Sequence, residues 1–104
     1  YNDLIVDSRN LIWLKSDTNL VSMDITHCLQ QPSQKMSDGI VKCGGYRDLI
    51  PYMGIMAWSL GVNGIFIEVH DEPEKAKCDG PTQWYLDRLE ELLNKFLFVI
   101  NNSF

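Results

Sequence analysis

The sequence predicts an α/β fold in which two parallel strands alternate with three helices. Along the chain, the spacing of apolar residues changes between the 3.6-residue period of a helix and the two-residue period of a strand. The second strand carries three consecutive apolar residues, 65–67, which is typical of a parallel strand buried on both faces. Two strands alone leave open edges and uncovered faces, so the pattern indicates a slice of a larger α/β sheet or barrel.

The first half of the chain contains a helix, a strand and a long loop. A helix is expected over 7–15, where an Asp or Ser cap precedes an apolar stripe. A strand is expected over 20–26, because three apolar residues recur at period two: Val21, Met23 and Ile25. The polar, glycine-bearing stretch 28–45 is predicted to be a loop, and a loop of that length is usually functional or disordered.

The second half repeats the alternation. A helix is expected over 47–60 and ends at Gly61, a residue that suits a helix C-terminus. A strand over 64–69 follows, and then a polar loop over 70–81. The last helix is expected over 82–99, with acidic residues early and a lysine late, as the helix dipole favours. A strand, helix and strand in this order imply parallel strands joined by a right-handed crossover.

Length and charge limit the classes of function. The chain has 104 residues, which suits one compact domain. With 9 basic and 14 acidic residues its net charge is −5, which argues against nucleic acid or an anionic membrane as a partner. No apolar run approaches the roughly 20 residues of a membrane-spanning helix.

Three cysteines without a Cys-x-x-Cys pair argue against a disulfide framework or a zinc ribbon. We therefore expect a reducing, cytoplasmic setting. No secretory signal is visible. The first residue is Tyr1 and not methionine, so either the start has been processed away or the chain is a piece of a longer one.

Ionisable residues follow both predicted strands. Ligands of parallel α/β folds gather at the carboxyl ends of the strands, where His27, Glu68 and Asp79 would converge. Imidazole and carboxylates bind divalent metals, and without a metal the same three groups can move protons. The competing interpretation is structural: a histidine bonded to backbone, a solvated Glu68, and a turn at Asp79-Gly80. A facial triad of His27, Glu68 and His70 is a further alternative.

At these residues the sequence resembles the 3-deoxy-D-manno-octulosonate 8-phosphate synthases. The resemblance covers nearly the whole chain in order, and four segments carry it: YNDLIVD at 1–7, DITHCLQQP at 24–32, GIFIEVH at 64–70 and KCDGP at 77–81. The resemblance implies that residues 1–104 are the C-terminal part of a (β/α)8 TIM barrel, the C-terminal βα units of a class I DAHP synthase-like domain. It also implies a homotetramer.

The activity implied is the condensation of phosphoenolpyruvate with D-arabinose 5-phosphate, which yields the eight-carbon sugar acid phosphate and inorganic phosphate. By position, His27, Glu68 and Asp79 match catalytic residues and three of four metal ligands of metal-dependent members; the fourth ligand would lie on the missing first strand. The form of residues 78–81 resembles the metal-independent branch, so the implied cofactor is either none or a divalent metal. Gln30 matches a substrate-binding residue, and 31–45 matches a mobile flap.

Some positions depart from the family pattern, among them Ser22, Cys43, Ile55 and Tyr85. Cations for the two phosphates are few, with Lys42 and Arg47 as the nearest candidates. Because a full barrel needs about 250 residues, we expect the isolated chain to be inactive. The alternatives are a sister synthase that uses another aldose phosphate, and a non-catalytic remnant.

Overall fold

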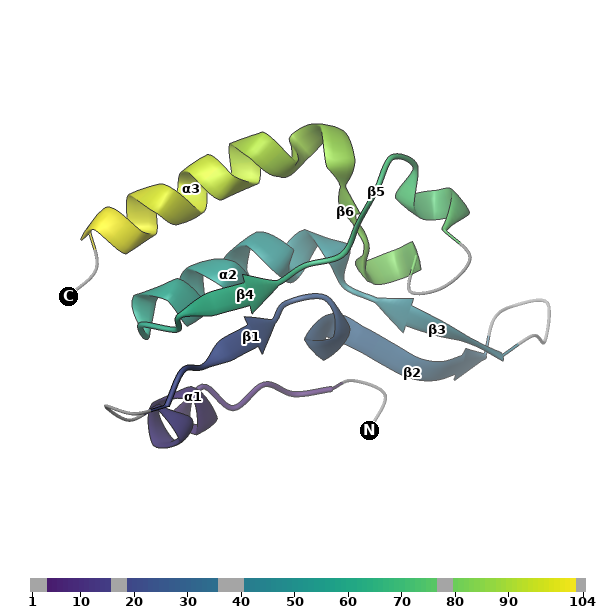
Figure 1. Ribbon diagram of the computed structural model, residues 1–104. Helices are drawn as coiled ribbons and strands as arrows, with labels where there is room; N and C mark the ends of the chain where they lie inside the picture. The colour runs from purple at the N-terminus through teal and green to yellow at the C-terminus, as the bar shows by residue number, and fades with distance from the viewer. Residues whose placement is uncertain (1–3, 16–18, 36–40, 77–79, 103–104) are drawn as a thin grey trace.

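The computed structural model describes residues 4–15, 19–35, 41–76 and 80–102 (Figure 1). Within this part of the chain, helices and short strands alternate and are joined by 3-10 turns. In chain order the elements are α1 Arg9–Leu14, β1 Ser22–Asp24, β2 Gln30–Lys35, β3 Val41–Gly45, α2 Ile50–Ser59, β4 Gly64–Phe66, β5 Val69–His70, β6 Trp84–Tyr85 and α3 Leu89–Asn102.

Strands β1 and β4 pair in parallel, as the sequence predicts, and α2 connects them (Figure 1). Met23 lies opposite Ile65 in the register. The pairing extends beyond the strands: Asn63 donates its backbone N–H to Val21 O at 2.8 Å, and Ile25 donates to Phe66 O at 2.9 Å. The chain is therefore α/β, with its two central strands in register up to their carboxyl ends.

The core lies between this strand pair and helices α2 and α3. The period-two residues of β1 and its flanks all point into it, and they are all buried: Val21, Met23 and Ile25. Phe96 of α3 is 2% exposed and packs directly onto Gly54 of α2. A Cβ on Gly54 would stand 2.1 Å from Phe96 Cζ, so only glycine allows the two helices to approach this closely.

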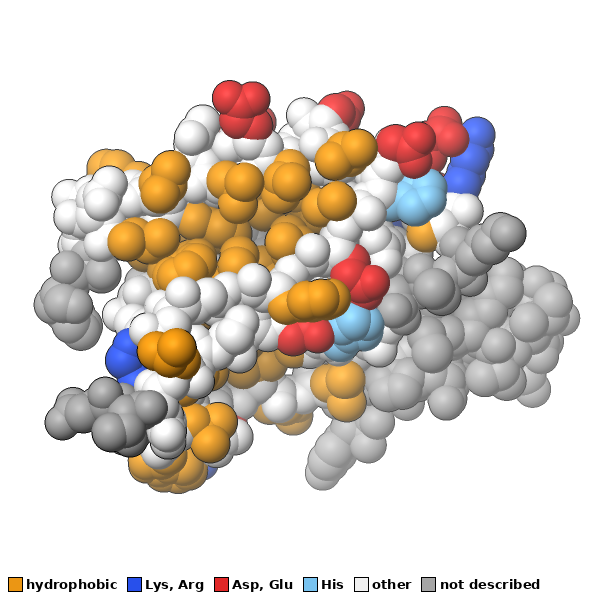
Figure 2. Space-filling model, viewed as in Figure 1, with side chains coloured by type: hydrophobic (Ala, Val, Ile, Leu, Met, Phe, Trp, Pro, Cys, Tyr) orange, Lys and Arg blue, Asp and Glu red, His pale blue; other side chains and the backbone are white. Residues whose placement is uncertain are grey.

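The opposite face of the β1–β4 pair is open. The molecule is flat, with extents of 49 × 31 × 18 Å, and Phe66 on this face is half exposed at 50%. Burial of 65–67 on both faces was therefore a wrong prediction, because no described element covers the second face. Figure 2 shows hydrophobic side chains gathered on the side of the molecule that includes α3 and β4.

The segment predicted to be a loop over 28–45 contains an antiparallel hairpin. Strands β2 and β3 pair from Gln30 opposite Gly45 to Lys35 opposite Val41, with an irregularity between Gln31 and Gln34. The prediction was wrong because backbone hydrogen bonds, and not apolar periodicity, form this ladder. The hairpin extends away from the strand pair β1–β4 (Figure 1).

The segment after β4 also holds more structure than predicted. Strand β5 pairs in parallel with β6, with Val69 opposite Trp84. Helix α3 consequently begins at Leu89, after a 3-10 turn, and not at residue 82.

Helix α2 begins at Ile50 after a 3-10 turn, and Gly61 follows its end with a φ of +82°, as the sequence predicts.

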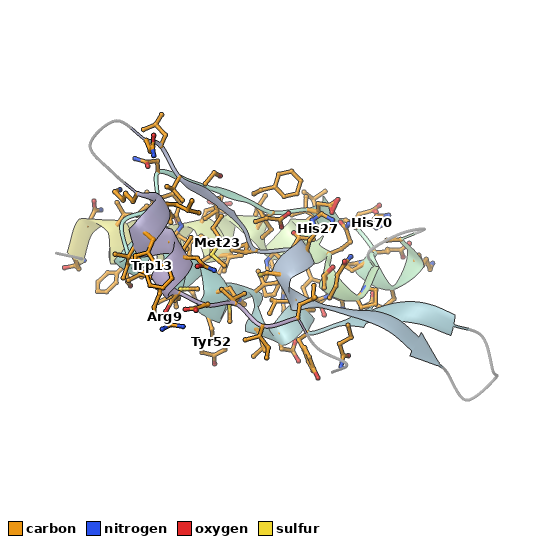
Figure 3. All side chains as sticks on the ribbon, turned by 90° about the horizontal axis from the view of Figure 1, so that it is seen from below. Arg9, Trp13, Met23, His27, Tyr52 and His70 are labelled. Atoms are coloured by element: carbon orange, nitrogen blue, oxygen red, sulfur yellow. The ribbon has the colours of Figure 1, made fainter. Side chains whose placement is uncertain are left out.

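The three tryptophans of the chain have different environments. Trp84 is 8% exposed and belongs to the core, and Trp58 is partly buried. Trp13 is 68% exposed on α1, where the Arg9 guanidinium lies 5.3 Å from its ring centre (Figure 3). Helix α1 has only six residues and buries none of them, which explains the exposure of Trp13.

Among the described residues, no helix is both long and apolar enough to cross a membrane.

Replacement of Gly54 by alanine tests the close contact of α2 with α3. We expect Gly54→Ala to lower the free energy of unfolding by about 1–3 kcal/mol, because the new methyl group overlaps the Phe96 ring. The matched control is Gly64→Ala, whose Cβ would meet Ser22 Oγ at an ordinary 3.4 Å. Urea denaturation followed by circular dichroism measures both variants, and equal stability of the two would contradict the packing argument.

Candidate functional site

The carboxyl end of β1 turns sharply, and the Asp24 carboxylate holds the turn together. Its Oδ1 accepts hydrogen bonds from the backbone N–H groups of Thr26 at 2.8 Å and His27 at 2.9 Å. Its Oδ2 lies 2.7 Å from Nδ1 of the His27 ring. Aspartate readily bonds backbone groups two or three residues ahead in this way, so the local sequence fixes where the imidazole stands.

Thr26 connects this turn to the neighbouring strand. Its side chain is fully buried, and its Oγ1 accepts a hydrogen bond from the backbone N–H of Glu68 at 2.8 Å. Glu68 is further fixed by its carbonyl, which accepts from Trp84 N at 2.9 Å. These two backbone contacts hold Glu68 beside the end of β1.

The imidazole and the second carboxylate therefore meet. Nε2 of His27 lies 3.0 Å from Oε1 of Glu68, so the ring stands between the carboxylates of Asp24 and Glu68. Figure 3 shows His27 just beyond the end of β1. The Phe66 ring stacks on the imidazole with centroids 6.1 Å apart and covers part of it.

The side chains that flank His27 are acidic. Burial opposes ionisation of Asp24, but backbone hydrogen bonds from His27 and Thr26 and the nearby imidazole favour the carboxylate, so the pKa of Asp24 lies below its ordinary value. Burial, together with the Asp24 charge, raises the pKa of the Cys28 thiol to about 11. Cys28 is therefore a protonated free thiol at neutral pH and a poor nucleophile.

Oε1 of Glu68 is buried and makes no hydrogen bond of good geometry within the described part of the chain. Its 3.0 Å approach to His27 Nε2 lacks the alignment of a hydrogen bond. A buried carboxylate oxygen normally has a donor or a cation as partner. A proton donor or a cation is therefore the kind of group that would complete the interactions of Glu68 Oε1.

The two side chains fit a divalent metal as adjacent ligands. Two donor atoms, each about 2.1 Å from one ion and at right angles, lie about 3.0 Å apart, which is the observed separation of Nε2 and Oε1. Metal-bound histidine usually donates its other ring N–H to a carboxylate, as Nδ1 faces Asp24 here. No group of three potential ligands occurs within the described ranges, and Asp79 lies outside them.

The predicted site residues have different placements. The structure brings His27 and Glu68 together, and their chemical roles stay predictions. Gln30, the first residue of β2, follows the His27 turn directly. His70 does not join them: its Nδ1 accepts from Glu72 N at 2.9 Å and lies 3.0 Å from an Asp71 oxygen, so the alternative facial triad was wrong.

Sequence reasoning did not single out Asp24 and Thr26 as site residues. The signal was present, because Asp-x-Thr-His places an acceptor three residues before a histidine at a strand end. It also missed the role of Arg47, which the sequence offers only as a candidate cation for a phosphate. A guanidinium that binds carbonyls far along the chain has no local sequence signal.

Arg47 fastens the segment between β5 and β6. Its side chain is 16% exposed, and its guanidinium donates to Gly80 O at 2.7 Å and Gln83 O at 2.8 Å. It also pairs with Glu74 at 3.1 Å and lies 5.1 Å from the centre of the Tyr85 ring. Arg47 thus holds the residues that follow Asp79 in place beside the start of α2.

Comparison with known proteins gives the family. The model of the DAHP synthetase I family matches residues 1–97. The chain belongs to the DAHP synthetase I family. Membership confirms the relationship inferred from the strand-end motifs, since those motifs lie within the matched range.

Three curated relatives of this DAHP synthetase I family chain share the name 2-dehydro-3-deoxyphosphooctonate aldolase. The chain is 53% identical over 100 residues to "2-dehydro-3-deoxyphosphooctonate aldolase 2" of Arabidopsis thaliana and 52% identical over 100 residues to the "2-dehydro-3-deoxyphosphooctonate aldolase" of Pisum sativum. A relative of the same name from Xanthomonas campestris is 38% identical over 97 residues. These matches cover 93–95% of the chain and 34% of each relative, so the chain spans about a third of their length.

Replacement of Arg47 by lysine tests whether its hydrogen bonds to Gly80 and Gln83 stabilise the fold. Lysine keeps the charge, but its three donors radiate from one nitrogen and cannot reach acceptors that bond three different nitrogens of the guanidinium. We therefore expect Arg47→Lys to lower the free energy of unfolding by about 1–3 kcal/mol. The control is Arg9→Lys, which changes an ion pair whose arginine side chain is 70% exposed and should leave the free energy of unfolding nearly unchanged. Urea denaturation compares the two, and an Arg47→Lys variant as stable as the control would contradict the fastening role.

Proposed function

We propose that this chain is the C-terminal part of a (β/α)8 barrel that condenses phosphoenolpyruvate with D-arabinose 5-phosphate. The products are 3-deoxy-D-manno-octulosonate 8-phosphate and inorganic phosphate. The single observation that carries the proposal is the meeting of His27 Nε2 with Glu68 Oε1 at the carboxyl ends of two paired parallel strands. Active sites of (β/α)8 barrels lie at that end of the barrel.

Family membership and the name shared by the relatives support this choice of reaction. In the proposal His27 and Glu68 orient the water that adds to phosphoenolpyruvate and carry its protons, because they are a base and an acid within contact of each other. Asp79, which lies outside the described residues, is proposed as the third catalytic residue. Gln30 binds substrate, since it lies three residues after His27, and the hairpin β2–β3 closes over the site as a flap.

His27, Glu68 and Asp79 are also the residues that would hold a divalent metal if this is a metal-dependent member. Such an ion would supply a positive charge that polarises a bound oxygen. Without a metal, His27 and Glu68 would fix the position of a bound water and accept or return its proton. With a metal, the lone pair of His27 would serve as a ligand, and only a carboxylate oxygen of Glu68 would be left to accept a proton.

The chain lacks part of what the reaction needs. Two phosphorylated substrates require several cations, and the described guanidinium of Arg47 is already engaged with Gly80 and Gln83. The remaining barrel strands would supply these groups, so we propose that the isolated chain is inactive. The complete protein is proposed to be a homotetramer in a reducing compartment such as the cytoplasm.

A chimera tests the proposal. The 100-residue segment of the pea relative that matches this chain is replaced by the chain itself, and phosphate release is followed with both substrates present. We expect turnover by the chimera, none by the isolated chain, and a loss of at least about 100-fold in the chimera with Glu68→Gln, because removal of a general acid or base costs 10²–10⁴-fold.

The matched control is Glu90→Gln on the exposed surface of α3, which should leave turnover unchanged. Activity with another aldose phosphate instead would favour the sister synthase. A folded but inactive chimera would favour the non-catalytic remnant and contradict the proposal.

A further inference from the structure

We propose that Asp24 is the positioning residue of this site and fixes the tautomer of His27, with the ring proton on Nδ1 and the lone pair on Nε2. The inference rests on the proposed function, since it says how His27 is prepared for that chemistry. Its basis is the 2.7 Å contact between Asp24 Oδ2 and His27 Nδ1.

The carboxylate is held in one orientation. Oδ1 of Asp24 accepts two backbone hydrogen bonds, from Thr26 at 2.8 Å and His27 at 2.9 Å. Rotation of the carboxylate would break both bonds, so Oδ2 is kept facing the ring. The same turn fixes the His27 backbone, and the ring therefore meets an acceptor that is already in place.

A carboxylate only accepts hydrogen bonds, and a neutral imidazole has a single N–H. Carboxylate oxygens lie beside both ring nitrogens, but of these two contacts only the one at Nδ1 is an aligned hydrogen bond, at 2.7 Å, because Oε1 of Glu68 takes part in no hydrogen bond among the described residues. The single proton is therefore placed on Nδ1, and Nε2 is left as the acceptor or ligand atom. On the far side, Nε2 faces Oε1 of Glu68 at 3.0 Å. A lone pair on Nε2 and a carboxylate oxygen at this distance are together suited to a group that brings a proton or a positive charge, such as a water molecule or a divalent cation.

The second histidine of the chain shows the opposite environment. Nδ1 of His70 accepts a hydrogen bond from the backbone N–H of Glu72 at 2.9 Å, although Asp71 is also 3.0 Å away. A backbone donor at Nδ1 places the proton of His70 on Nε2. A nearby aspartate therefore does not by itself determine which ring nitrogen of a histidine carries the proton. For His27, the tautomer is set by the orientation in which Asp24 is held.

Asp24→Asn separates this role from a structural one. The asparagine Oδ1 still accepts both backbone hydrogen bonds, while its NH₂ group replaces Oδ2 and donates toward Nδ1. The variant should keep its fold but move the ring proton of His27 to Nε2. Asp71→Asn is the matched control, because it changes the acid beside the other histidine and leaves His27 untouched.

The tautomer is read from the ¹⁵N shifts of the histidine rings in the chimera, at about pH 8.5, well above the ordinary imidazole pKa of about 6.5. The His27 signal is assigned by its disappearance in His27→Gln. We expect the Nδ1–H form in the parent and in Asp71→Asn, and the Nε2–H form in Asp24→Asn. The Asp24→Asn change should also lower kcat by about 10- to 100-fold, with KM nearly unchanged.

A parent ring protonated on Nε2 or on both nitrogens would overturn the inference, as would an Asp24→Asn variant that keeps the parent tautomer or the parent kcat. The spectra require no substrate. The Nδ1–H form in a chimera without turnover would therefore count against the proposed function and still support the role of Asp24 in setting the tautomer.

Discussion

The parallel pairing of β1 with β4 is the constraint on which the rest of the structure depends. The ladder continues past the strands to the bond between Ile25 N and Phe66 O, so both strands end at the same level. The residues that follow the two strands therefore lie side by side. The buried Thr26 hydroxyl connects them, because it accepts a hydrogen bond from the backbone N–H of Glu68. The contact of His27 with Glu68 is a consequence of this register.

One face of this strand pair packs against the core, and the other face carries the residues of the candidate site. Side chains that point toward α2 and α3 are apolar and buried, such as Met23 and Ile25. The alternate positions face the open side and carry Asp24 and the half-exposed Phe66. Because neighbouring side chains on a strand point to opposite faces, a dense core and an ionisable site can lie on consecutive residues of β1.

Local patterns predicted the parts of the fold that local forces determine. The period-two burial of Val21, Met23 and Ile25 and the helix end at Gly61 follow from apolar spacing and from the tolerance of glycine for positive φ. The β2–β3 hairpin was missed because its strand Gln30–Lys35 is polar throughout and contains a proline.

The β5–β6 pair was missed for another reason, since it joins Val69 to Trp84 across 15 positions of chain. In the site, strand ends pointed to His27 and Glu68, because the carboxyl ends of paired parallel strands lie together. The orientation of Asp24 required coordinates, since it depends on a turn whose backbone N–H groups converge on one oxygen.

The hydrogen bonds of Arg47 connect the β2–β3 hairpin to the 80–83 turn. Arg47 follows β3 by only two residues, and its guanidinium is bonded to Gly80 and Gln83 on the other side of the corner. Gly45 at the base of the hairpin is in tight contact with Thr82, so a Cβ there would stand 2.3 Å from the threonine methyl. The base of the hairpin and the 80–83 turn are therefore joined by two hydrogen bonds of one side chain and by one close approach of the backbone, so that neither could be displaced without the other.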